Sequence, residues 1–275
     1  MRAMVLNDDV AVVQGRDGLF LVNRHDRYIG RAIERYGEYN GIEGSALTSL
    51  VQSNDIVIEV GANIGSHTVG LAKKTGPRGK VFAFEPQRAC YALLQSQIAL
   101  NQLGNVYAFN EGLGTDDATL WLPPVDYSRQ GNFGGVSLVA SAGENHEAVK
   151  VRRLDDVCGD LPSVALIKID VEGMEREVIA GGIQLITRTK PILYVENDRF
   201  DKHSALISLI QKLGYRLWWH FPPLFSPRNF FGVKENEYGG TVSINMLCVH
   251  SAQPVPQHSM AEIKSPDDPH PLAPK

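Results

Sequence analysis

Short apolar runs alternate with amphipathic segments through the middle of this chain. Apolar runs of about four to eight residues bounded by glycine, proline or charged residues are typical of buried strands, whereas apolar residues three and four positions apart indicate helices. The alternation predicts an α/β fold, with a mostly parallel seven-stranded sheet covered by helices on both faces. We expect strands at residues 56–60, 81–84, 106–109, 165–169, 192–195 and 215–219, and helices near 65–75, 87–101, 174–188 and 203–213.

The pattern changes before and after this alternation. Two β-like stretches flank a Gly-Arg-Asp-Gly turn near the N-terminus and predict a hairpin. Two helices are expected after it, near residues 27–36 and 43–51. We therefore treat residues 1–54 as an N-terminal lead-in and residues 55–250 as the main domain. The last apolar strand, at residues 242–249, follows a long irregular segment and is expected to pair antiparallel.

Two further segments depart from the alternation. Residues 111–154 contain β-like pieces at 118–122, 136–139 and 149–153, separated by turn-rich sequence, and we interpret them as an inserted β-rich flap. Residues 251–275 are polar and rich in proline. Because such a segment has little to bury, we expect a mobile tail.

The stretch D-I-V-I-E-V-G-A-N-I-G-S-H-T, residues 55–68, carries the clearest chemical signal. A buried strand ends in an acid and a glycine turn, and a helix follows, which is the arrangement of a nucleotide-binding corner. Glycine has no Cβ, so the backbone of this turn can approach a ligand closely. The spacing E-x-G-x-x-x-G differs from the G-x-G-x-x-G of dinucleotide folds and favours S-adenosylmethionine over NAD. We expect the cofactor to contact Glu59, Gly61, Ala62, Asn63 and Gly65, with Glu59 near its cationic amine.

A second acid stands at the end of the next strand, K-V-F-A-F-E-P. Glu85 lies 20 residues beyond Gly65. The second strand of an open α/β sheet ends beside the ribose, so a carboxylate there can accept both ribose hydroxyls. Glu85 followed by Pro86 is also typical of a helix start, and the two roles are compatible; we include Pro86 in the cofactor site. Asn110 and Glu111 follow the third strand and are expected near the adenine, with a simple turn as the alternative.

Composition narrows the range of partners. The 275 residues carry a formal net charge of −4, which argues against a nucleic-acid partner because such partners usually require a basic face. Three widely separated cysteines form neither a metal-binding nor a disulfide pattern and favour a cytoplasmic protein. The first residues have no apolar segment of signal-peptide length, and no run approaches the roughly 20 apolar residues of a transmembrane helix.

Further motifs follow in the order R-L-D-D-V, K-I-D-V-E-G-M-E and P-I-L-Y-V-E-N. Together with the glycine corner and V-F-A-F-E-P, over about residues 38–197, they resemble the FkbM family of S-adenosylmethionine-dependent methyltransferases. One departure is Glu59, where the family more often has Asp. The resemblance implies a class I methyltransferase, Rossmann-like fold and usually O-methylation. It implies no particular acceptor, so a small molecule, a sugar, or a glycan or lipid-linked acceptor all fit.

The fourth strand carries the candidate catalytic groups. Methyl transfer is an in-line displacement, so the enzyme must align the acceptor oxygen, the methyl carbon and the sulfur, and a base or metal can remove the hydroxyl proton. Strand alternation places Lys168 and Asp170 on one side, and we predict that Asp170 faces the methyl group or the acceptor. The alternative is a salt bridge that anchors the strand end. His67, after the glycine corner, is a further candidate base; the alternative is local packing or capping.

A metal site is a further prediction at the same edge of the sheet. Glu196 and Asn197 follow the fifth strand. This part loosely resembles catechol-type O-methyltransferases, in which an acid after strand four joins an acid and an Asn after strand five to bind Mg²⁺. Oxygen ligands suit this ion. The candidate ligands are Asp170, Glu196 and Asn197, and the alternative is a solvated turn with helix-capping acids.

Three other functions compete with an O-methyltransferase. The first is a protein that binds S-adenosylmethionine without catalysis, against which the complete glycine corner and the ribose acid argue. The second is an NAD(P)-dependent oxidoreductase, which the glycine spacing disfavours. The third is a nucleic-acid methyltransferase, for which a basic, aromatic-rich surface and an N-P-P-Y-type motif are missing. The sequence identifies neither the acceptor nor the oligomeric state.

Overall fold

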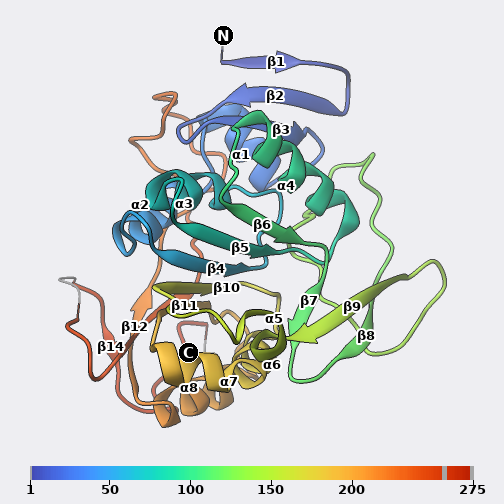
Figure 1. The fold of residues 1–275 in the computed structure, drawn as a ribbon. Helices are drawn as coiled ribbons and strands as arrows, with labels where there is room; N and C mark the ends of the chain where they lie inside the picture. Colours follow the sequence, from blue (N-terminus) through green and yellow to red (C-terminus); the bar gives the residue numbers. More distant parts are fainter. Residues whose placement is uncertain (1, 256–258, 273–275) are drawn as a thin grey trace.

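A computed structural model describes residues 2–255 and 259–272 of the chain. Within these residues, one large sheet is flanked by two small three-stranded sheets, one at the N-terminus and one formed by the insertion (Figure 1). The carboxyl ends of the parallel strands face the side on which the insertion and the β12–β13 connection approach the sheet.

The central sheet has eight strands where seven were predicted. Five neighbouring strands run parallel, and β13 pairs antiparallel with β11 and β12, as expected for the last apolar strand. The eighth strand is β14, at the far edge beside β12. In spatial order the strands are β6 (Val106–Phe109), β5 (Lys80–Phe84), β4 (Ile56–Val60), β10 (Leu166–Ile169), β11 (Ile192–Glu196), β13 (Asn245–His250), β12 (Tyr215–His220) and β14 (Glu262–Ile263).

Alternating side chains of the parallel strands supply two separate hydrophobic cores. In β4, Ile58 and Val60 belong to one core and Val57 to the other, because successive strand residues point to opposite faces. The first core is closed by α5 (Leu154–Cys158), α6 (Glu175–Gly181), α7 (Ile183–Thr189) and α8 (His203–Lys212). The second is closed by α1 (Ile29–Tyr36), α2 (Gly41–Ser49), α3 (Thr68–Thr75) and α4 (Arg88–Leu100). The prediction of helices on both faces is therefore confirmed.

The helix predicted at residues 174–188 is divided into α6 and α7. Gly182 ends the first helix and begins the second. A Cβ at Gly182 would lie 2.6 Å from Cδ2 of Leu154, so α5 approaches the chain too closely for any larger residue. This break turns α7 away from α6, and periodicity alone does not reveal it.

The N-terminal hairpin is present and is attached to α4. Strands β2 (Val10–Gln14) and β3 (Leu19–Asn23) form it, and a further strand, β1 (Ala3–Val5), joins β2. The Asn101 amide exchanges two hydrogen bonds with the backbone of Leu19, at 2.9 and 2.7 Å. These contacts fix the hairpin to one helix of the main domain.

The insertion forms a small sheet in the order β7 (Gly112–Gly114), β9 (Glu147–Arg153), β8 (Ala118–Leu122). It projects from the main domain beside α6 (Figure 1). The strand predicted at residues 136–139 is wrong, because the structure has only a bridge between Val139 and Trp121 there. The turn-rich residues before it pass over the carboxyl end of the sheet instead.

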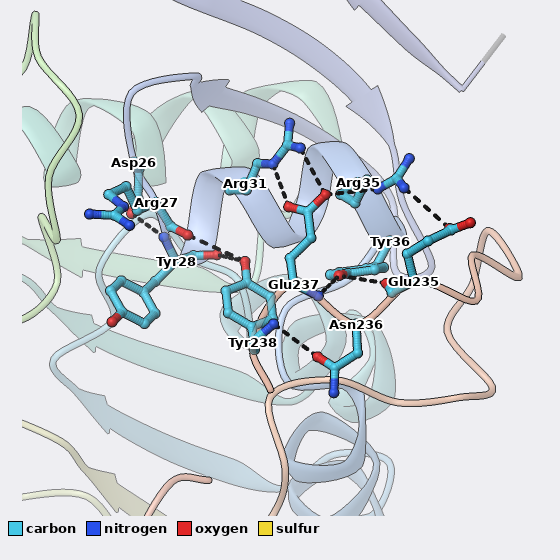
Figure 2. A network of polar contacts seen from close by, with 10 residues as sticks. All are labelled: Asp26, Arg27, Tyr28, Arg31, Arg35, Tyr36, Glu235, Asn236, Glu237 and Tyr238. Carbon is cyan, nitrogen blue, oxygen red and sulfur yellow. Dashed lines mark hydrogen bonds and ion pairs between the residues drawn. The ribbon is translucent and has the colours of Figure 1, made fainter. Parts of the chain in front are cut away.

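Ion pairs join α1 to the long segment between β12 and β13 (Figure 2). The Arg31 guanidinium donates to both carboxylate oxygens of Glu237, at 2.8 and 2.9 Å. Arg35 lies 3.1 Å from Glu237 and 3.2 Å from Glu235. The Tyr36 hydroxyl donates to the Glu235 carbonyl at 3.0 Å and accepts from the Glu237 amide at 2.9 Å. We call this set of contacts the α1 clamp.

The expectation that residues 251–275 bury little is wrong for the part that the structure describes. Ile263 of β14 pairs with Leu217 of β12 and is 3% exposed. His270 is also buried, and its Nε2 donates to the Asn197 carbonyl at 2.8 Å. Residues 256–258 and 273–275 lie outside the described residues. Among the described residues, no helix combines the length and apolar character needed to cross a bilayer.

Candidate active site

A cavity of about 640 Å³ lies at the carboxyl ends of β4, β5, β10 and β11. Its volume is in the range of small-molecule sites, and open α/β sheets bind ligands at this edge. The turn after β4 and the residues after β5 form one end. The turns after β10 and β11 and the β12–β13 segment form the other. The predicted site residues that line it are Glu59, Gly61, Ala62, Asn63, His67, Glu85, Pro86, Glu111, Lys168, Asp170 and Glu196.

The glycine corner is held tightly against the neighbouring strands. Gly61 has a φ of +81°, and its amide and that of Ala62 both donate to the Phe84 carbonyl, at 2.9 and 3.0 Å. A Cβ on Gly61 would lie 1.7 Å from the Asp170 carbonyl oxygen. Glycine is therefore required here by the adjoining strand end, in addition to any approach to a ligand. Gly65, also at positive φ, packs against Leu94 of α4 and does not line the cavity.

Glu85 supports the start of α4, which is one of its two predicted roles, and it also lines the cavity. It is 3% exposed, and its carboxylate accepts the amides of Asn63 and Gln87, each at 2.8 Å. Gln87 is the N-cap of α4, so one oxygen supports the helix start while the side chain faces the cavity. Burial raises the pKa of Glu85 to about 7, against the effect of these two hydrogen bonds.

Lys168 lies at the centre of a buried charge cluster. Its ammonium is 3.0 Å from the Asp170 carboxylate, and it lies opposite Glu59 in the register of β10 and β4. Burial alone lowers the pKa of Lys168, but Asp170, Glu43 and Glu59 outweigh it and raise the pKa. Lys168 also holds the pKa of Asp170 below its usual value. Both members of the predicted pair are therefore charged, and the Asp170 side chain, 37% exposed, reaches the cavity.

His67 is the predicted catalytic residue that the electrostatics disfavour. The ring is buried, and its Nε2 is 3.7 Å from a Glu43 carboxylate oxygen. Burial, followed by the charge of Lys168, lowers the pKa of His67 to about 3. An imidazole with so low a pKa is neutral at physiological pH and a weak proton acceptor. Its contacts fit the alternative of local packing.

Glu43 is a cavity residue that the sequence analysis missed. It lies on α2 and accepts hydrogen bonds from Asn40 at 2.6 Å and from Asn245 at 3.3 Å. Burial raises the pKa of Glu43 to about 7. The sequence signal was available, because Glu43 precedes Leu47 by four residues and so shares the buried face of the helix.

The acidic cluster differs from the predicted metal site in one residue. Asp170, Glu172 and Glu196 each offer an oxygen atom within 4.8 Å of the others. Asn197 does not join them, because its amide is buried and donates to Sδ of Met246 at 3.3 Å. As side chains alternate along a strand, Asn197 points away from the side that Glu196 occupies. The third residue of the cluster is therefore Glu172 and not the predicted Asn197.

The two residues after β6 separate in the structure. The Asn110 amide donates to the carbonyls of Glu85 and Pro86, at 2.9 and 3.0 Å, and does not line the cavity. Glu111 lines it and forms a 2.8 Å ion pair with Lys150 of the insertion. Only Glu111 is therefore placed to contact a ligand by its side chain.

The model of the methyltransferase FkbM domain matches residues 59–217, more than half of the chain. The chain belongs to the FkbM methyltransferase family. The strand order, with β13 antiparallel between β11 and β12, is the class I methyltransferase fold that the resemblance implied.

Three relatives illustrate the range of this family. Methyltransferase 1 of Beauveria bassiana is 31% identical over 148 residues, which cover 46% of this chain and 58% of the relative. The 2-O-methyltransferase NoeI of Sinorhizobium fredii is 26% identical over 194 residues, 64% of this chain and 79% of NoeI. The hexuronic acid methyltransferase AglP of Haloferax volcanii is 26% identical over 174 residues, 62% of this chain and 67% of AglP. The chain thus spans less than two thirds of the length of Methyltransferase 1.

The FkbM match covers only part of the residues that line the cavity. It includes the glycine corner, Glu85 and Asp170, which lie at the predicted cofactor end. It leaves out Glu43 of the lead-in and residues 240–244 of the β12–β13 segment, which also line the cavity. The match also includes the turns after β10 and β11, so segments outside it build only part of the cavity wall.

Proposed function

We propose that this FkbM-family protein transfers a methyl group from S-adenosylmethionine to a hydroxyl oxygen of a small molecule, a sugar or a glycan-linked acceptor. The observation that carries the proposal is one cavity that holds the glycine corner, the buried Glu85 and the charged Asp170. The donor set fits the cofactor, because Glu85 suits ribose hydroxyls and Glu59 suits a cationic amine. When bound, S-adenosylmethionine supplies an electrophilic methyl group on a sulfonium ion.

The protein's own contribution is to position the acceptor and receive its proton. Asp170 is kept ionised by Lys168, so it can accept a hydrogen bond from an acceptor hydroxyl and orient the oxygen lone pair. The carboxylate that receives the proton is Asp170 or its neighbour Glu196, whose pKa burial and Asp170 raise well above the usual value. O-methylation is also supported by the name of NoeI, and a sugar acceptor by the name of AglP.

The proposal includes a divalent cation as a testable element. Asp170, Glu172 and Glu196 are the residues that would hold it, since carboxylate oxygens suit Mg²⁺. Its role would be to lower the pKa of the acceptor hydroxyl. The alternative is that Asp170 orients the hydroxyl without a metal.

Binding of the demethylated cofactor tests the proposal directly. Titration calorimetry should detect binding of S-adenosylhomocysteine with a Kd in the micromolar range, about 8 kcal/mol. NADH added to the same protein should leave its tryptophan fluorescence unchanged. Absence of S-adenosylhomocysteine binding, or saturable quenching by NADH, would contradict the proposed function.

Glu85→Ala should weaken S-adenosylhomocysteine binding by about 10- to 150-fold. The substitution removes the proposed ribose acceptor, and a hydrogen bond to a charged group contributes about 1.5 to 3 kcal/mol. Calorimetry measures the effect. Glu34→Ala is the matched control, since Glu34 is a mostly buried acid paired with Arg24 outside the cavity, and its affinity should be that of the wild type. Equal affinities in the two variants would place the ribose elsewhere.

A further inference from the structure

The acceptor end of the cavity is formed by the turns after β10 and β11 and by the β12–β13 segment. Glu172, Asp198 and Arg199 supply its charged groups, and residues 240–244 and Leu224 supply the opposite wall. Glu172 has a φ of +55°, a conformation that disfavours most side chains. This end lies beyond Asp170, on the side away from Glu85.

Carboxylates dominate the charge of the whole cavity. Eight of the lining residues are Asp or Glu, whereas two are Lys or Arg. The Lys168 ammonium is 3.0 Å from Asp170, and the Arg199 guanidinium bonds to Glu172 and lies 3.4 Å from an Asp198 oxygen. Both basic groups are therefore already paired, and neither is free to receive an anionic ligand.

Among the described residues, two carboxylate oxygens at this end are buried without a hydrogen bond, and one of them, Oδ1 of Asp198, lies 3.4 Å from Arg199. Oε2 of Glu196 is buried and accepts no hydrogen bond from the residues that the structure describes. Leaving a buried acceptor without a donor is unfavourable, so a ligand that supplies a donor is favoured. Hydroxyl and ammonium groups are such donors, whereas a carboxylate or phosphate offers only further acceptors.

We infer that the acceptor is a polyhydroxylated compound that is neutral or cationic near the methylated hydroxyl, such as a hexose or an amino sugar. Uronates and phosphorylated sugars are disfavoured, because their negative charge would be brought against the excess of carboxylates. Because both basic side chains are already paired, they offer no free positive charge to an anion. The unpaired Oε2 of Glu196 favours a ligand that donates a hydrogen bond. This inference rests on the proposed function and narrows its substrate class.

The test compares three sugars that share one ring and differ in charge. Protein saturated with S-adenosylhomocysteine and freed of divalent cations is mixed at pH 8 with D-glucose, D-glucosamine or D-glucuronate at millimolar concentration. Saturation-transfer NMR measures binding of each sugar. We expect signals from glucose and glucosamine, and binding of glucuronate at least about tenfold weaker. Glucuronate binding equal to or tighter than that of glucose would overturn the inference, and so would the absence of binding by all three sugars.

A pair of substitutions tests the charge mechanism. Glu172→Gln with Asp198→Asn removes both partners of Arg199, so glucuronate binding should rise at least about tenfold relative to glucose binding. Glu172→Gln alone, the milder variant, should give a smaller rise in the same direction. Glu144→Gln, on an exposed loop outside the cavity, should behave as the wild type. Unchanged glucuronate binding in both cavity variants that retain S-adenosylhomocysteine binding would overturn the inference. Loss of cofactor binding in the wild type would instead contradict the proposed function.

Discussion

Asp170→Asn is expected to lower kcat for methyl transfer by about 100-fold or more, because a positioned proton acceptor contributes at least this factor. The substitution preserves the size of the side chain and removes the charge that faces the acceptor. S-adenosylhomocysteine affinity should change little, because the corner residues and Glu85 are unaltered. Steady-state kinetics with labelled S-adenosylmethionine and calorimetry separate the two effects.

Two controls accompany this measurement: one tests whether removing the charge of another buried acid lowers kcat, and the other tests for a metal. Asp155→Asn changes another buried acid, one that accepts the amides of Gln184 and Leu185 outside the cavity, and should affect Tm but not kcat. EDTA should reproduce the Asp170→Asn defect in the wild type, and Mg²⁺ should restore activity, if the cation contributes. Full activity in EDTA would contradict a role for a metal and leave the Asp170 carboxylate as the proposed base. Full activity of Asp170→Asn would contradict both proposed roles of Asp170, as a base and as a metal ligand. Alignment of the reactants would then be the source of catalysis.

Gly61→Ala is expected to weaken S-adenosylhomocysteine binding more than 100-fold. A residue with a Cβ at positive φ costs about 1 to 2 kcal/mol, and here the Cβ would also lie 1.7 Å from the Asp170 carbonyl oxygen. The corner and the end of β10 must therefore move apart, which displaces the groups at both ends of the cavity. Calorimetry measures the affinity, and circular dichroism verifies that the variant is folded.

Gly232→Ala is the matched control for this substitution. Gly232 has a φ of +68°, and no atom lies within 4 Å of the position of a Cβ. The Gly232→Ala substitution therefore has the same energetic cost of a Cβ at positive φ, without a steric clash. If a folded Gly61→Ala variant bound S-adenosylhomocysteine as tightly as Gly232→Ala, the cofactor would have to lie away from the corner.

The sequence predicted the elements whose residues carry local and unambiguous signals. The residues of β4, β10 and β11 are mostly buried, so each reads as a short apolar stretch with sharp limits, interrupted by Glu59 in β4 and Lys168 in β10. The structure brings Gly61 and the acid after β5 together in the cavity, because their positions depend on the strand ends alone. Glu85 is the clearest example, because its carboxylate contacts the start of α4 and its side chain also lines the cavity.

The errors arose where distant contacts decide the structure. Ile263 of β14 is buried because β12 offers an edge to pair with, and nothing in its proline-rich surroundings indicates that partner. Asn197 follows Glu196 directly, and the alternation of the strand turns its amide to Met246. Glu43 was interpreted as part of a short helix, whereas the other residues of its site come from β10 and β13, more than 100 positions away.

The α1 clamp has a consequence for attempts to exchange acceptor specificity between FkbM proteins. Arg31 and Glu237 are 206 positions apart, yet their bidentate contact holds two walls of one cavity. A chimera that imports only the lead-in or only the β12–β13 segment would combine two surfaces whose charges were not matched to each other. Both segments must therefore be transplanted together, around an unchanged cofactor half.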